Sequence, residues 1–225
     1  MISDSIKRPK LIIFDWDNTL ADTTEVVTKV INRLRADFNQ DPMTSGDVLR
    51  YTGDPERDWI IDLFGKKCDE MSKKYQLYYA EENLSFIPTL LFGARKIIDT
   101  LSSMSIQSAI LTNKYRDITI KEIEYLSLTD TFISVFTKDD LPVKKPDPIG
   151  ITMIVDKWKL SNPEEEISKD EIWFIGDTMT DMATAKNYGC QAFFVGDPSW
   201  ITEKYADYIL NIGNLNELSK FLENF

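Results

Sequence analysis

Two aspartates, Asp15 and Asp17, stand two residues apart directly after a short apolar run, Leu11–Phe14. Such a run is typical of a buried strand in a parallel sheet, and charged groups at the carboxyl end of that strand face the crevice where open α/β sheets bind ligands. Two carboxylates held close there can bind a divalent cation, or act as a nucleophile and a proton donor. The alternative is that both aspartates only cap the next helix.

The chain contains no histidine, which excludes several classes of site. Ser-His-Asp and Cys-His catalysis need an imidazole base, and no His-ligated metal site can form. Any acid–base chemistry therefore falls to Asp, Glu, Lys or Tyr. A metal site would be built from oxygen ligands, which indicates Mg²⁺.

The overall composition is that of an ordinary globular protein. The 225 residues are 43% hydrophobic and 28% charged, enough for one large domain or a domain with an insert. A net charge of −11 argues against nucleic acid as a partner, and we find no basic cluster suited to a membrane surface. Without an apolar signal region or a membrane-length apolar run, we expect a cytoplasmic location. The two cysteines are too few for a disulfide scaffold.

Hydrophobic periodicity predicts alternating strands and helices over most of the chain. After the first strand, the predicted strands are 107–111, 132–136, 171–175, 191–195 and 208–210. The predicted helices are 21–38, 47–51, 55–64, 67–84, 94–104, 117–126, 149–159, 179–188 and 215–222. The alternation indicates an α/β fold with a doubly wound parallel sheet and helices on both faces. Because no convincing strand falls between about 21 and 87, we expect a core formed by 1–20 and 88–225 with an inserted helical domain at 21–87.

Further polar groups lie at or after the ends of the predicted strands, or in the loop between them. They are Thr112, Asn113, Lys145, Asp177 and Asp181. Strand ends of a parallel sheet converge on one edge, so these groups and the first two aspartates can share one site. Each segment alone is a weak signal, because Asp177 can cap the following helix and a Lys-Pro pair usually marks a turn.

Four segments together resemble the four motifs of the haloacid dehalogenase superfamily of phosphohydrolases. They are Asp15–Leu20, Leu111–Asn113, Lys144–Pro148 and Gly176–Asp181. The resemblance covers nearly the whole chain and implies a Rossmann-like core with a helical cap. The nearest branch resembles phosphoglycolate phosphatases and β-phosphoglucomutases. Asn18 stands where glycine is commonest in the family, but asparagine tolerates a left-handed backbone.

The resemblance implies a two-step phosphoryl transfer at the first motif. Asp15 is then the nucleophile that forms an aspartyl-phosphate. Asp17 is the general acid for the leaving alkoxide and afterwards the base that activates water, and its backbone carbonyl binds the metal. Backbone N–H groups around Trp16 and Asp17 receive the phosphoryl oxygens.

The other motifs are expected to supply phosphate and metal contacts. Thr112 and Asn113 hydrogen-bond the phosphoryl group, and Lys145 pairs with that group and the nucleophile. Asp177 binds Mg²⁺ directly, whereas Asp181 holds either its water shell or Lys145. The implied metal set is Asp15, Asp17, Asp177 and Asp181.

Substrate choice is expected to reside in the cap, where 51–57 resembles the family's specificity loop around Gly53. Arg50 and Arg57 are candidates for a second anionic group such as a carboxylate, although both can equally be surface arginines. Trp16 is expected at the entrance. Cap lysines leave open the Schiff-base chemistry of the phosphonate-cleaving branch; they are Lys29, Lys66, Lys67, Lys73 and Lys74.

These features favour an Mg²⁺-dependent phosphatase for a small phosphomonoester, with phosphoglycolate as the first guess. The second aspartate separates the chain from the metal-independent dehalogenase branch. A phosphosugar mutase uses the same Asp15 chemistry and stays open, as does a non-catalytic regulator that binds phosphate ligands. The expected oligomeric state is a monomer or a homodimer.

Overall fold

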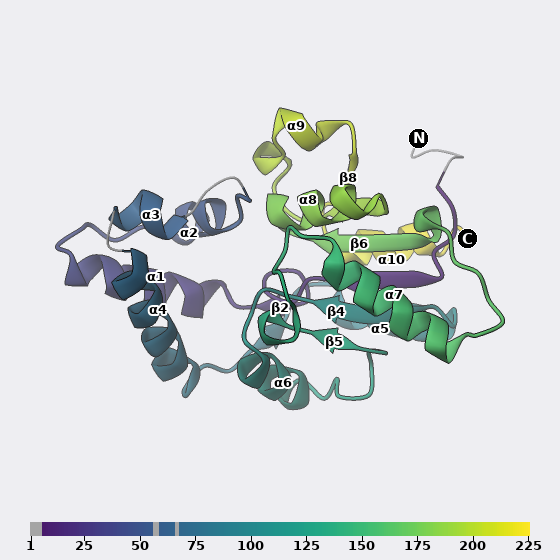
Figure 1. The fold of residues 1–225 in the computed structure, drawn as a ribbon, viewed down its shortest axis with the longest axis horizontal. Helices are drawn as coiled ribbons and strands as arrows, with labels where there is room; N and C mark the ends of the chain where they lie inside the picture. The colour runs from purple at the N-terminus through teal and green to yellow at the C-terminus, as the bar shows by residue number, and fades with distance from the viewer. Residues whose placement is uncertain (1–5, 56–58, 66–67) are drawn as a thin grey trace.

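The centre of the molecule is a six-stranded sheet. The computed structural model describes residues 6–55, 59–65 and 68–225. The strands are β1 Leu11–Phe14, β4 Gln107–Leu111, β5 Val135–Phe136, β6 Ile172–Gly176, β7 Gln191–Phe194 and β8 Ile209–Asn211, in the order β5-β4-β1-β6-β7-β8 (Figure 1). All neighbouring pairs are parallel, so every strand ends at the same edge of the sheet.

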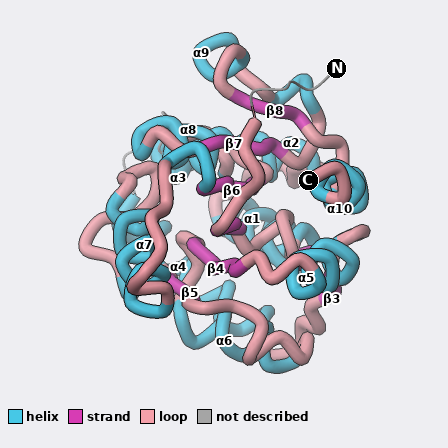
Figure 2. The backbone as a smooth tube through the Cα atoms, turned by 90° about the vertical axis from the view of Figure 1, so that its right-hand side faces the viewer, coloured by secondary structure: helices cyan, strands magenta, loops and turns pink. Residues whose placement is uncertain are grey.

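Helices cover both faces of the sheet, as predicted (Figure 2). Alternate side chains of β1 point to opposite faces: Ile12 packs with α5 Ala94–Ser103, α6 Arg116–Tyr125 and α10 Leu215–Leu222. Leu11 and Ile13 pack with α7 Ile149–Ser161, α8 Met179–Tyr188 and α9 Glu203–Ala206. Both faces of β1 are therefore fully buried, which explains its continuous apolar sequence.

A separate group of helices extends from one side of this core (Figure 1). It comprises α1 Thr24–Asp37, α2 Ser45–Thr52, α3 Trp59–Phe64 and α4 Cys68–Asn83. Helix α1 packs on α2 and α4, and α3 packs on α4. Val26, Val30 and Tyr79 form a small hydrophobic cluster of their own there.

The chain enters and leaves this helical group through two adjacent short strands. Strand β2 Ala21–Asp22 pairs antiparallel with β3 Thr89–Leu90. The prediction of a helix from residue 21 is therefore wrong at its beginning, because α1 begins only at Thr24. Asn18 and Asp22 explain the delay: their side chains accept the backbone N–H groups of Thr23 and Thr24.

Other boundaries differ where an element is short or lies at an edge. The strand predicted at 132–136 is reduced to Val135–Phe136, paired with Ile110 and Leu111 on one side only. Helix α9 was not predicted, because four residues are too few to display a helical period. Among the described residues, no helix is both long and apolar enough to cross a membrane.

The first turn of α5 provides a test of the packing between α5 and α10. Gly93 has a φ of +87°, and a Cβ atom there would lie 2.3 Å from the backbone nitrogen of Asn216. We expect Gly93→Ala to lower the free energy of unfolding by about 2 kcal/mol or more, through strain and this collision. Gly46→Ala is the control, since nothing lies within 4 Å of its Cβ position. Urea denaturation should show that variant unchanged or about 0.5 kcal/mol more stable.

Candidate active site at the carboxyl edge of the sheet

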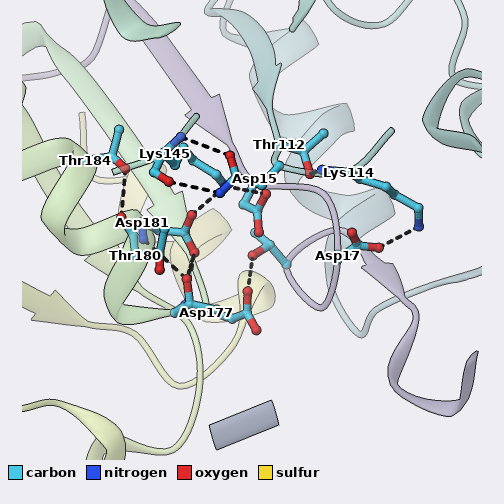
Figure 3. A network of polar contacts seen from close by, with 12 residues as sticks. Asp15, Asp17, Thr112, Lys114, Lys145, Asp177, Thr180, Asp181 and Thr184 are labelled. Carbon is cyan, nitrogen blue, oxygen red and sulfur yellow. Dashed lines mark hydrogen bonds and ion pairs between the residues drawn. The ribbon is translucent and has the colours of Figure 1, made fainter. Parts of the chain in front are cut away.

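Three buried carboxylates meet where β1 and β6 end (Figure 3). Asp15 follows β1 and Asp177 follows β6; the backbone N–H of Asp15 donates to the carbonyl of Ile175, which ties the two strand ends together. Asp181 lies in the first turn of α8. One oxygen from each carboxylate lies within 4.8 Å of the others.

A single ammonium group bridges two of these acids. Nζ of Lys145 donates to Oδ1 of Asp15 and to Oδ1 of Asp181, both at 2.7 Å. The backbone of Lys145 is held by the Asn113 side chain, whose Oδ1 accepts from its N–H at 3.0 Å and whose Nδ2 donates to its carbonyl at 3.1 Å. The Asn113 amide thus positions the lysine loop, which sequence reasoning did not foresee. Lys144, the neighbouring lysine, is exposed.

The cluster holds more negative than positive charge in a place that water hardly reaches. Burial raises the pKa of Asp15 to about 7, with Lys145 opposing and Asp181 and Asp17 adding to the rise. Burial and the charges of Asp181 and Asp15 likewise raise the pKa of Asp177. The pKa of Lys145 is raised too, because Asp15 and Asp181 outweigh the cost of burying its charge. A hard divalent cation fits this oxygen donor set, since it would offset the repulsion.

Asp15, Asp17 and Asp177 do not cap the helices that follow them, whereas Asp181 takes part in the capping box of α8. At α8, the cap is Thr178: its Oγ1 accepts from the N–H of Asp181, and Asp181 Oδ2 accepts from the N–H of Thr178. Asp177 instead accepts a hydrogen bond from Thr19 Oγ1 at 3.1 Å. At α1 the corresponding contacts belong to Asn18, whose φ of 55° is left-handed as expected. Helix capping therefore does not occupy Asp15 or Asp177, whereas both oxygens of Asp181 are held by Lys145 and Thr178.

Asp17 lies on the other side of Asp15 and has its own lysine. Its side chain is a quarter exposed, and its Oδ1 accepts from Nζ of Lys114 at 2.7 Å. Lys114 and its second partner, Glu122, were missed from the sequence; the only hint was a lysine directly after Thr112 and Asn113. Thr112 itself is buried, and its Oγ1 accepts from the N–H of Lys114.

The expectation that Trp16 lines the entrance is wrong. Its side chain is fully buried in the core, and its Nε1 donates to Oε2 of Glu122 at 2.7 Å. The indole belongs to the hydrophobic face of the sheet that carries α5 and α10. Only its backbone can contribute to the site.

The helical group reaches the site through the end of α2. The carbonyl of Gly53 accepts from the backbone N–H of Thr180 at 3.1 Å and from its hydroxyl at 3.2 Å. Beside this contact lies a cleft of about 650 Å³ whose lining includes Arg50, Asp177 and Trp200. Arg57 lies outside the described residues.

None of the described lysines of the helical group is buried as the amine of a Schiff-base site would be. Lys29 and Lys74 form ion pairs with Glu25 and Asp37, and Lys73 is exposed. Lys66 and Lys67 lie outside the described residues. A larger hollow of about 890 Å³ lies at the opposite edge of the sheet, away from the acid cluster, and its lining carries charges of both signs.

Comparison with known proteins gives a consistent result. Residues 12–195 match the family model of haloacid dehalogenase-like hydrolases. The chain is 26% identical to the pyrophosphatase PpaX of Bacillus velezensis over 215 residues, covering 90% of this chain and 96% of that protein. It is 27% identical to a phosphoglycolate phosphatase of Rhodospirillum rubrum over 192 residues, covering 80% of this chain and 77% of that protein.

Solved structures show the same fold. A haloacid dehalogenase-like hydrolase from Bacteroides fragilis superposes with a TM-score of 0.79 at 21% identity, covering 94% of this chain and all of the other. The family model spans most of the chain and includes all four predicted motifs and the sheet except for β8. The protein is a hydrolase that belongs to the haloacid dehalogenase-like family.

Proposed function

We propose that the protein is an Mg²⁺-dependent phosphatase that hydrolyses a small phosphomonoester through an aspartyl-phosphate. The observation that carries this proposal is the buried Asp15 carboxylate, paired with Lys145 beside Asp177 and Asp181. A nucleophilic carboxylate can approach an anionic phosphate only if nearby positive charge offsets the repulsion. The names of the relatives, which act on phosphoryl compounds, support the same chemistry.

In the proposed first step, an oxygen of Asp15 attacks phosphorus while the bond to the leaving alkoxide breaks. Asp17 donates its proton to that alkoxide, which would otherwise leave poorly. In the second step Asp17 takes a proton from water as the water oxygen attacks phosphorus and the Asp15–phosphorus bond breaks. Lys145 offsets charge on Asp15 and on the phosphoryl group, and Thr112 and backbone N–H groups of 16, 17 and 113 hold its oxygens.

The acid cluster also fits the proposed metal. Asp15, Asp177 and the backbone carbonyl of Asp17 would hold Mg²⁺, with Asp181 acting through water or through Lys145. When bound, Mg²⁺ would offset the charge of the phosphoryl oxygens and orient them. Residues 21–87 would form a cap that closes on the core of 1–20 and 88–225 and limits the access of water.

A carboxylate-bearing substrate such as phosphoglycolate suits the cleft beside the acids. Asp177 and Arg50 line the same cleft of about 650 Å³, so a phosphate near the acids would place a second anion toward the arginine. Arg50 is exposed at α2, and a guanidinium binds a carboxylate through paired hydrogen bonds.

The reaction itself is tested with 2-phosphoglycolate as the probe. We expect Mg²⁺-dependent release of phosphate, which Asp15→Asn abolishes and Lys145→Met lowers at least about 100-fold in kcat, because each removes part of the nucleophilic site. Lys144→Met is the matched control and should retain wild-type activity, since that lysine is exposed. Sugar-phosphate isomerisation without phosphate release would instead identify a mutase. Full activity of Asp15→Asn would refute the proposed nucleophile.

Buried Asp15 also predicts a pH-dependent stability. Its pKa is about 7 in the folded protein against a usual 3.8, so the folded state holds this proton more tightly between those values. In EDTA, we expect the Tm to fall as the pH rises from about 4 to about 7. Asp15→Asn should reduce that fall, whereas Asp99→Asn, at an exposed site, should not. Mg²⁺ should raise the Tm more at pH 8 than at pH 5, because protons compete less with the metal.

The role of Arg50 is tested with two substrates. Arg50→Ala should raise KM for 2-phosphoglycolate about 10-fold through loss of an ion pair with the carboxylate. Ethyl phosphate, which lacks that carboxylate, should show nearly the same KM with both proteins. A similar rise for both compounds would contradict carboxylate recognition at this arginine.

A further inference from the structure

Beside the first cluster lie two buried charged residues, Lys114 and Glu122, to which the reaction as proposed above gives no role. Nζ of Lys114 donates to Oδ1 of Asp17 and to Oε2 of Glu122, both at 2.7 Å. The side chains of Lys114 and Glu122 are only 3% and 4% exposed. The same Glu122 oxygen accepts from Nε1 of Trp16 at 2.7 Å. Glu122 thus contacts Trp16, the residue before Asp17, and is linked through Lys114 to the Asp17 carboxylate.

Lys114 is held in place by contacts of its backbone and by a ring of the helical group. The N–H of Lys114 donates to Oγ1 of Thr112, and its carbonyl accepts from the N–H of Lys138. The ring of Tyr79, from α4 of the helical group, lies with its centroid 5.5 Å from the Lys114 ammonium. This arrangement keeps the ammonium in one position relative to Asp17.

Stability alone is a poor reason for such a cluster. Removing an ammonium and a carboxylate from water costs free energy, and their mutual attraction often does no more than offset that cost. Apolar residues of similar size would often give a fold of equal stability. The ion pair with Asp17 differs from that with Glu122, because the Asp17 side chain is a quarter exposed whereas that of Glu122 is buried. The contact uses Oδ1 of Asp17, so Oδ2 is the oxygen available to carry a proton.

We infer that Lys114, held by Glu122, is a positioning residue that aims the Asp17 carboxyl group at the leaving-group oxygen. The inference rests on the proposed function, in which Asp17 is the general acid. The two buried lysines then have different roles. Lys145 pairs with the nucleophile Asp15, and Lys114 positions the proton donor Asp17. Proton transfer requires donor and acceptor within hydrogen-bond reach, so a carboxyl group that rotates freely donates inefficiently.

This role predicts a dependence on the leaving group. An alkoxide needs a proton as it departs, whereas p-nitrophenolate leaves readily without one. The ratio kcat/KM reports the steps up to departure of the first product, so it isolates proton donation from the later attack of water. A residue that only supports the fold would affect both kinds of substrate alike.

The experiment compares 2-phosphoglycolate with p-nitrophenyl phosphate at saturating Mg²⁺. We expect Lys114→Met to lower kcat/KM about 100-fold for the alkyl phosphate and less than about 3-fold for the aryl phosphate, in line with the usual contribution of a general acid. Lys121→Met is the matched control, since this lysine is exposed on α6 next to Glu122. It should change neither value.

Two further variants guard against an effect of misfolding. Glu122→Gln keeps an acceptor for Trp16 but removes the charge that holds Lys114. It should lower kcat/KM for the alkyl phosphate selectively, but by less than Lys114→Met does. In an Asp17→Asn background, Lys114→Met should add no selective loss, because the group that it positions no longer donates. Equal losses for both substrates, or no loss, would overturn the inference alone. A wild-type protein inactive on both compounds would overturn the proposed function and this inference with it.

Discussion

Repulsion among buried carboxylates is the constraint on which the rest of the site depends. Asp15, Asp177 and Asp181 crowd one edge of the sheet, and one ammonium, that of Lys145, lies between two of them. Crowded buried acids hold their protons more tightly, or bind a cation. This excess of negative charge favours binding of a cation, which is the property that the proposed metal site needs.

Uncharged residues next to the acids allow the carboxylates to lie so close together. A Cβ atom on Gly176 would lie 2.4 Å from Cβ of Asp181, so only glycine at the end of β6 lets that carboxylate approach so closely. The Asn113 amide holds the backbone of Lys145, and Thr178 caps α8 while binding Asp181. Each of these groups acts on the chemistry only by fixing where a charged group can lie.

The two buried lysines and the helical group complete the arrangement. Lys145 contacts acids of the core, whereas Lys114 lies between Asp17 and the ring of Tyr79, which belongs to the helical group. The helical group also contacts the core through Gly53 and Thr180 and is joined to it by the paired strands β2 and β3. The helical group therefore contacts the core beside Lys114 and at the cleft that Asp177 lines.

The sequence by itself indicated the parallel sheet, the succession of most helices and strands, and the acids and lysine that lie together at the carboxyl edge. Those features follow from hydrophobic periodicity and from acids placed directly after apolar strands. Both signals lie within a short segment of sequence and do not depend on residues elsewhere in the chain. The β2–β3 pair could not be predicted in this way, and the strand predicted at 132–136 proved shorter, because strands of two residues depend on their partners.

Tertiary structure alone decided how the side chains at the site are shared. The buried indole of Trp16, the use of the Asn113 amide and the pairing of Lys114 with Asp17 and Glu122 join residues as many as 106 positions apart. No periodicity reports such contacts, since a lysine or glutamate has the same local sequence signal on a solvated helix face as in a buried ion pair. Once the fold buries such a side chain, its charge must have a partner, because burying an unpaired charge is strongly unfavourable.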